Sequence, residues 1–284
     1  MLRQKWGSVV CPSCGQLVGV NDDQCLNCGR RNPGMWGFAP FLSRWGRDVG
    51  FTELIIGSCA AIYVLSLVID LGGVGMGGFL NFLSPSRRAL FLLGESGTIP
   101  VFAFGRWWTV LSAGWLHGGI LHILFNMMLL RQLGPTTSEF YGSSRMAIIY
   151  TIAGATGFLA STLAGTLVFL PGFLRGAGFT VGASASICGL AGALLYYGRR
   201  TGSSMVSQQI KSWLITVFIF GFLVSRIDNW AHLGGLLGGY GAAKILDPLR
   251  PERLDHLVAA LVCLALTVIA IVFSVLHGLP LLRV

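Results

Sequence analysis

The sequence predicts an all-α polytopic membrane protein. Of its 284 residues 54% are hydrophobic and only 11% are charged, whereas about a quarter are charged in soluble globular proteins. The few charges are also segregated, because seven stretches contain no Asp, Glu, Lys or Arg: 54–69, 110–130, 146–174, 176–198, 212–225, 229–243 and 256–282. Helices need about 20 apolar residues to cross a membrane and porin strands about 10. We therefore predict seven helical spans, which argues against a soluble enzyme.

The first element along the chain is a cysteine module over residues 1–34. Cys11 and Cys14 form one CxxC turn, Cys25 and Cys28 form another, and each turn is followed by glycine. Four thiolates at this spacing favour tetrahedral Zn²⁺, and the module resembles a zinc ribbon. Two disulfides or a rubredoxin-type iron site are the alternatives, and a cytoplasmic location disfavours disulfides. We expect a structural Zn²⁺ that folds a module too small to fold on its core alone, and a cytoplasmic partner of the module stays open.

Residues 35–50 form the predicted linker to the first span. Trp36 and Trp45 alternate there with Arg44 and Arg47, a mixture typical of a segment at the membrane surface. Basic residues beside aromatic ones also occur in nucleic-acid binding. Because this segment adjoins a span, we prefer the lipid interface and expect no nucleic-acid partner.

The distribution of basic residues predicts on which side of the membrane the N-terminus lies. If the N-terminus is cytoplasmic, most of the 20 Lys and Arg residues lie on the cytoplasmic side, as the positive-inside rule favours. Residues 1–50 also lack the apolar region of a cleavable signal peptide. We therefore expect an N-terminus inside, a C-terminus outside, and the N-terminal ends of the second, fourth and sixth spans near the outer surface.

Polar side chains lie near those outer ends, where they are costly and are candidates for function. The second span carries His122 and Asn126 four residues apart on one face, with His117 elsewhere and nearer the outer end. The fourth span opens with Ser184 and the sixth carries His232. Each residue alone has a structural interpretation, such as a serine bonded to its own helix. Together they provide a nucleophile, a general base and oxyanion donors, and without an acid inside these spans we expect a dyad.

Small residues would let these helices approach one another. His232, Gly235 and Gly239 share one helical face, and Gly189 and Gly192 follow Ser184 by one and two turns. Glycines at such spacing allow helix backbones to come close in lipid. These glycines, called the glycine stripe below, therefore favour direct contact between the fourth and sixth spans.

These motifs resemble the rhomboid intramembrane serine proteases. The residues that carry the resemblance are His117-x4-His122-x3-Asn126, Gly182-x-Ser184 and Ala231-His232-x2-Gly235-x3-Gly239, within residues 51–247. The resemblance implies that Ser184 is the nucleophile and His232 the base, that His122 and Asn126 line the oxyanion hole, and that His117 supports a nearby loop. It also implies a six-helix core over 51–247, an extra transmembrane helix within 248–284, and a first outer loop partly submerged in the membrane.

One position departs from the family pattern. The first outer loop usually carries a Trp-Arg pair, but here Thr109 follows Trp108. Two alternatives are open: Arg106 substitutes for the missing arginine, or the loop is anchored differently. The serine, both histidines and the asparagine are all present, so we expect an active enzyme.

The predicted activity is cleavage of transmembrane segments of other proteins within the lipid bilayer. The resemblance implies no metal or organic cofactor for the chemistry, and a location in a bacterial inner membrane with the active site open to the outer side. A non-catalytic binder of transmembrane clients is the main alternative. A transporter with a histidine proton relay would need paired intramembrane acids or inverted repeats, and the sequence shows neither.

Overall fold

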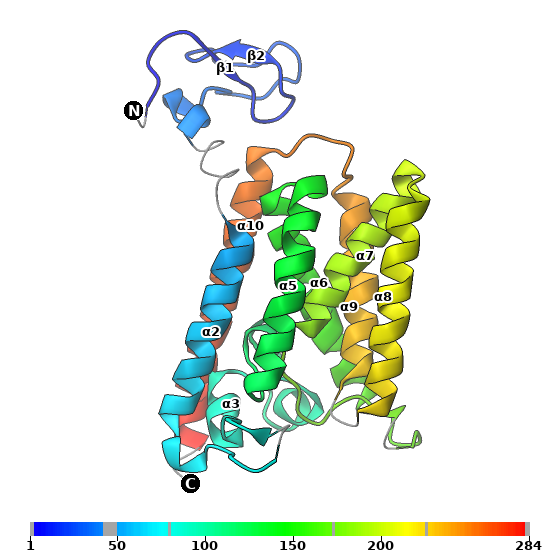
Figure 1. Cartoon of the computed structure of the whole chain (residues 1–284). Coiled ribbons are helices and arrows are strands. Elements are labelled where there is room, and N and C mark those ends of the chain that lie inside the picture. The colour runs from blue at the N-terminus through cyan, green and yellow to red at the C-terminus, as the bar shows by residue number, and fades with distance from the viewer. Residues whose placement is uncertain (1–2, 42–49, 79–80, 172–173, 225–226, 282–284) are drawn as a thin grey trace.

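A bundle of long helices makes up most of the protein (Figure 1). The computed structural model describes residues 3–41, 50–78, 81–171, 174–224 and 227–281. Within these ranges the helices of 17 or more residues are α2 (Phe51–Ile69), α5 (Ile120–Tyr141), α6 (Ser143–Ala164), α7 (Ser184–Thr201), α8 (Ser204–Leu223), α9 (Asn229–Ile245) and α10 (Leu254–Leu281). The predicted all-α membrane fold, with an added helix at its C-terminal end, is confirmed.

Not every long helix is apolar enough to cross a membrane by itself. Among the described residues α2, α6, α8 and α10 are, and a fifth span arises if α5 is joined to the short helices before it. The two remaining helices, α7 and α9, are rich in glycine, alanine and serine. They lie inside the bundle, where they face other helices more than lipid, so seven charge-free stretches overstate the number of apolar spans.

The predicted second span, residues 110–130, is not one helix. The short helices α4 (Thr109–Ser112) and η5 (Ala113–Trp115) are bent by 92° from α5. The break contains Gly118 and Gly119, and the backbone at Gly119 is extended rather than helical (φ 165°). His117 therefore lies in the bend, and the spanning part begins only at Ile120.

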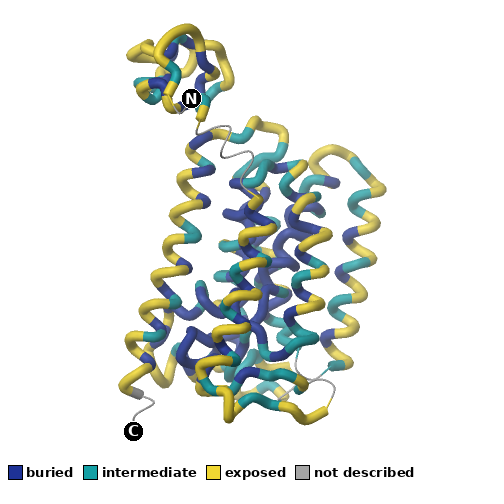
Figure 2. Tube along the Cα trace, turned by 60° about the vertical axis from the view of Figure 1, so that its left-hand side comes forward, coloured by how far each residue is buried: buried dark blue, intermediate teal, exposed yellow. Residues whose placement is uncertain are grey.

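Glycines bring α6, α7 and α9 into close contact. A Cβ atom at Gly235 or Gly239 of α9 would overlap the backbone of α7, at Ala185 and Gly189 respectively. A Cβ atom at Gly157 of α6 would lie 2.6 Å from the Ala231 carbonyl oxygen of α9. Buried residues accordingly gather in the middle of the bundle and exposed ones along its outside (Figure 2). The contact that the glycine stripe predicts between the fourth and sixth spans is present.

Short elements at one end of the bundle make up the connection between α2 and α5. They are η2 (Leu71–Gly73), α3 (Arg87–Leu93), the π-helical turn η4 (Ile99–Ala103), α4 and η5. The Ser86 side chain caps α3 at its start, and Gly94 ends it in a left-handed conformation (φ 109°). Each of these elements has seven residues or fewer, so none of them is long enough to cross a membrane by itself. They lie at the opposite end of the bundle from the N-terminal module (Figure 1).

The N-terminal module is a small two-stranded sheet with two cysteine turns. Strands β1 (Ser8–Val10) and β2 (Leu17–Gly19) pair antiparallel, with Val9 opposite Val18. The turn η1 (Met35–Gly37) follows, and Trp36 is exposed there. Arg44, Trp45 and Arg47 of the predicted interfacial linker lie outside the described residues, so that assignment stays a prediction.

Candidate active site

The side chains of Ser184 and His232 meet where two buried helices begin. Ser184 is the first residue of α7, and His232 lies in the first turn of α9. His232 Nε2 and Ser184 Oγ are 2.8 Å apart, and His232 is only 5% exposed. The glycine contact between the two helices sets this distance, because it brings their first turns together.

An aspartate caps the helix that carries the histidine. Asp228 Oδ1 accepts a hydrogen bond from the Ala231 backbone at 3.0 Å, and Asp228 Oδ2 accepts one from Ser161 Oγ at 2.5 Å. The carboxylate is thus held by the helix start and by α6. His232 Nδ1 is buried and has no hydrogen-bond partner among the described residues. Within the described part of the chain, the Ser–His pair therefore has no third acidic member, and Asp228 stabilises the first turn of α9.

Gly182 lies directly against the ring of His122. Its φ of +129° favours glycine, and a Cβ atom there would lie 2.6 Å from His122 Nε2. His122 Nδ1 accepts a hydrogen bond from the Gly118 backbone at 3.2 Å. A neutral ring that accepts at Nδ1 carries its proton on Nε2, so this N–H faces the backbone just before Ser184.

The Asn126 side chain is buried one turn below His122. Its Nδ2 donates to the His122 carbonyl oxygen of its own helix at 2.8 Å, and its Oδ1 has no partner among the described residues. An amide nitrogen has two hydrogens, so one N–H is committed to the helix and the other remains. Asn126 is thus turned partly toward its own backbone, which spacing alone could not predict.

Of two further polar residues near the site, His117 contacts His122 and Ser186 of α7 points away from His232. The buried ring of His117 packs edge to face on His122, with 5.2 Å between ring centroids. Ser186 faces α6 instead, because a Cβ atom at Gly154 would lie 2.6 Å from its Oγ. Ser184 is therefore the serine beside His232, and Ser186 is not.

The connection between α2 and α5 holds the backbone that leads to Ser184. Ser96 and Thr180 form a reciprocal pair of backbone hydrogen bonds of 3.2 and 2.8 Å, and the Gly182 amide donates to the Ala113 carbonyl at 3.0 Å. Thr109, at the departure from the family pattern, is buried and donates its hydroxyl to the Arg106 carbonyl at 2.7 Å. The Thr109 hydroxyl thus forms a hydrogen bond inside the loop and stabilises it.

Two buried ionisable residues share this loop. Burial raises the pKa of Glu95 to about 7, although the nearby positive charges of Arg87 and Arg106 lower it. Burial also lowers the pKa of Arg106 to about 10, which leaves that guanidinium charged at neutral pH. Burial thus disfavours the charged form of both groups, and the Arg87 guanidinium, 3.4 Å from Glu95 Oε1, partly offsets this for the carboxyl group.

The four cysteines of the N-terminal module form one cluster. Their sulfur atoms all lie within 4.8 Å of one another and no disulfide joins them. Cys11 and Cys28 are separated by 3.8 Å between sulfurs, and Cys14 and Cys25 by 3.6 Å. Four Zn–S bonds of about 2.3 Å in a tetrahedron place sulfurs about 3.8 Å apart. The cluster therefore has the size that a tetrahedral metal ion requires.

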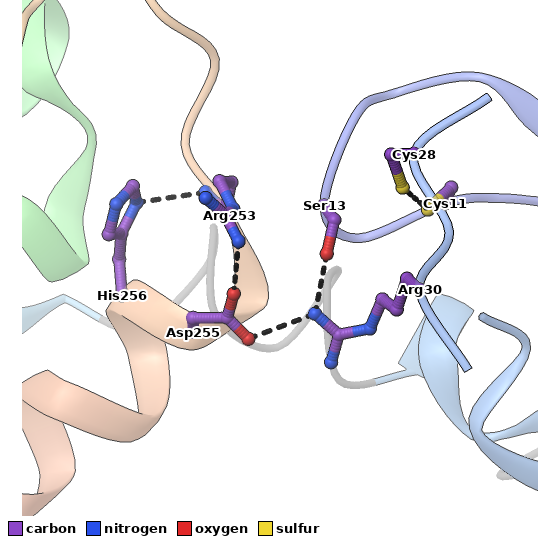
Figure 3. A network of polar contacts seen from close by, with 7 residues as sticks. All are labelled: Cys11, Ser13, Cys28, Arg30, Arg253, Asp255 and His256. Atoms are coloured by element: carbon purple, nitrogen blue, oxygen red, sulfur yellow. Dashed lines mark hydrogen bonds and ion pairs between the residues drawn. The ribbon is translucent and has the colours of Figure 1, made fainter. Parts of the chain in front are cut away.

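A salt bridge fastens this module to the start of α10 (Figure 3). Arg30, two residues after Cys28, donates to Ser13 Oγ at 2.7 Å and to Asp255 Oδ1 at 2.9 Å. Arg253 donates to the other oxygen of Asp255 at 2.6 Å. Partly exposed ion pairs contribute about 0–1 kcal/mol, so this contact adds little to the stability of the fold.

Fold and contacts together define a class, the polytopic helical membrane proteins that carry a partly buried Ser–His pair at one end of the bundle. Residues 104–249, more than half of the chain, match the family model of the rhomboid domain. The chain belongs to the rhomboid family.

Similar proteins come from bacteria and plants. The chain is 38% identical over 173 residues to the rhomboid protease GluP of Bacillus subtilis, which covers 59% of this chain and 32% of that protein. It is 32% identical over 170 residues to the mitochondrial RHOMBOID-like protein 6 of Arabidopsis thaliana, covering 58% and 52%. Over 142 residues it is 30% identical to the putative rhomboid protease YdcA of B. subtilis, covering 49% and 66%. The matches thus span from a third to two thirds of these relatives.

Proposed function

We propose that this protein is an intramembrane serine endopeptidase that cleaves transmembrane segments of other membrane proteins. The observation that carries the proposal is the 2.8 Å contact between Ser184 Oγ and His232 Nε2 at the starts of two buried helices. A serine hydroxyl is a weak nucleophile unless a neighbouring base takes its proton. The likeness to proteins named rhomboid proteases supports the same activity.

In the proposed reaction His232 acts first as a base and then as an acid. Its Nε2 takes the proton from Ser184 Oγ while the oxygen forms a bond to the scissile carbonyl carbon. The protonated imidazole then gives that proton to the leaving amine as the C–N bond breaks, which leaves an acyl-enzyme. Water, deprotonated by His232, hydrolyses the ester and restores the serine.

The oxyanion of the tetrahedral intermediate needs fixed hydrogen-bond donors. The first backbone N–H groups of α7 have no partner within the helix, and Ser184 is the first residue of that helix. His122 Nε2–H faces the same segment at Gly182, and Asn126 has a remaining amide hydrogen. We assign these groups to the oxyanion hole, and we assign His117 to the support of His122 through their ring contact.

The substrate must offer an accessible carbonyl at this site. A carbonyl that is hydrogen-bonded within a transmembrane helix cannot reach Ser184, so we propose substrates whose helices unwind locally and carry small residues at the cut. The site lies at the end of the bundle opposite the cysteine module (Figure 1). A cytoplasmic N-terminus in a bacterial inner membrane would open the site toward the outer side.

The test of the activity uses the full chain in liposomes with single-span substrates. A substrate with Gly and Ala in the outer half of its span should give two fragments cut within the membrane. A substrate with an all-leucine span is the control and should remain intact. Folded protein that cuts neither of them, across varied small-residue sequences, would contradict the proposal.

We further propose that Cys11, Cys14, Cys25 and Cys28 bind one structural Zn²⁺ ion. The sulfur spacing fits the ion, and Gly15 and Gly29 lie at positive φ directly after each turn, which lets the backbone fold around a metal. Four thiolates leave no open position, so the ion would fold residues 1–34 and take no part in hydrolysis. The module would face the cytoplasm, where it could recruit a partner protein.

Metal analysis of the purified protein should find about one zinc ion per chain. The variant Cys11→Ser, Cys14→Ser should lose the ion, because two thiolates do not hold it, and proteolysis should then remove the N-terminal module while the helical bundle stays intact. Cys263→Ser is the matched control and should keep the metal. Full zinc content in the double variant would refute the assignment.

A further inference from the structure

One residue of α10 contacts two residues of the connection between α2 and α5. Ser274 is fully buried and lies outside residues 104–249, which match the rhomboid domain. Its Oγ accepts a hydrogen bond from Trp108 Nε1 at 3.0 Å, and its backbone oxygen accepts one from Arg106 Nη2 at 2.9 Å. Both donors come from the turn that leads into α4, so the added helix holds the start of α4.

The surroundings of Ser274 are shaped for this contact. A Cβ atom at Gly94 would lie 2.7 Å from Ser274 Oγ, so only a glycine leaves room for the hydroxyl there. The rings of Phe273 and His277 flank Trp108 with centroid separations of 4.4 and 5.3 Å. The Trp108 ring thus packs against α10, and its single N–H group has Ser274 Oγ as its acceptor.

Arg106 connects the segment before α4 to α3 as well as to α10. Its side chain is 0% exposed, and its Nη1 donates to the Phe91 carbonyl oxygen at 2.6 Å. Together with the bond to Ser274, the guanidinium joins α3 to α10. A buried cation needs such acceptors, and α10 supplies one of them. The buried Arg106 guanidinium therefore depends on α10 as well as on α3 for its acceptors.

A short series of bonds leads from this junction to the site. Trp108 is the residue that precedes α4, and Ala113, just after α4, accepts the hydrogen bond of the Gly182 amide at 3.0 Å. On the other side, Ser96 pairs with Thr180, and the Thr109 and Ser96 hydroxyls lie 3.1 Å apart. The backbone at 180–182 is thus held by the loop that α10 anchors. That backbone sets Gly182 against His122 and leads into Ser184.

We propose that Ser274 is a positioning residue for the reaction and that α10 acts through it to fix the backbone that precedes Ser184. The proposal rests on the proposed function, because it assigns a role in that same site. It concerns the geometry of the oxyanion donors and not the affinity for the substrate. Weakening the contact should consequently lower kcat and leave KM nearly unchanged.

The experiment compares Ser274→Ala, Trp108→Phe and the double variant in liposomes. Ser274→Ala leaves the indole N–H buried without an acceptor, which should lower kcat about 10-fold. Trp108→Phe removes the donor and keeps a ring. The double variant should be no slower than Ser274→Ala, because both changes remove one bond. Leu276→Ala is the control, since Leu276 lies two residues away and is 63% exposed; it should retain the wild-type kcat.

Hydrogen exchange gives a readout that does not need activity. The Thr180 and Gly182 amides should exchange about 10-fold faster in Ser274→Ala than in wild type, also in an inactive Ser184→Ala background. Unchanged exchange with unchanged kcat, or fully additive losses in the double variant, would overturn the positioning role. If the wild type cleaves nothing yet exchange responds as expected, the proposed function fails and the structural role of Ser274 stands.

Discussion

Replacing Ser184 with alanine is expected to lower kcat/KM for a cleavable transmembrane substrate by at least about 1,000-fold. Ser184 Oγ is the group that would attack the scissile carbonyl, and an alanine methyl group cannot form the acyl-enzyme. Only the oxyanion donors and substrate binding would remain. The measurement is the initial rate of fragment formation in liposomes at equal amounts of folded protein.

The chain offers a matched control two residues away. Ser186 is a buried serine of the same helix, but it faces Gly154 of α6 and not His232. Ser186→Ala should therefore keep activity close to that of the wild type. Full cleavage by Ser184→Ala would show that another group is the nucleophile.

The second large effect is expected for His232→Ala. Without the imidazole 2.8 Å from its oxygen, Ser184 has no base to take its proton, so cleavage should fall by about 1,000-fold or more. Reaction of Ser184 with a fluorophosphonate should slow in parallel, because the same deprotonation activates the serine toward this reagent.

His256 provides the control for this change. It lies at the start of α10, where its Nδ1 accepts a hydrogen bond from the Arg253 backbone at 2.9 Å, at the end of the bundle far from Ser184. His256→Ala should leave cleavage and labelling close to wild type. Wild-type labelling of Ser184 in His232→Ala would mean that His232 is not the base.

The sequence predicts the helices better than their ends and bends. Charge-free stretches identify helices because lipid excludes charge. The stretch 110–130 conceals a 92° bend because Leu116, His117 and two glycines interrupt the helix without adding charge. Composition does not identify α7 and α9 as strongly apolar spans. These two helices pack against other helices, where small residues such as glycine and alanine allow close contact and strongly apolar side chains are not required.

The site is predictable to the extent that its signals are local. Two CxxC turns bring four sulfurs together over a short stretch, and a glycine stripe predicts that α7 and α9 touch. Asp228 was missed, although an aspartate just before a helix is a typical N-cap. No local signal could pair Ser96 with Thr180 or Trp108 with Ser274, because these contacts join distant parts of the chain and arise only from the packing of the whole bundle.

The most direct test of the account is the identity of the residue that a fluorophosphonate modifies in the wild-type protein. Peptide mass spectrometry after labelling in liposomes should find one adduct, on Ser184, and none in Ser184→Ala. An adduct on a different residue, or labelling that persists unchanged in Ser184→Ala, would contradict the assignment of the nucleophile and with it the proposed mechanism.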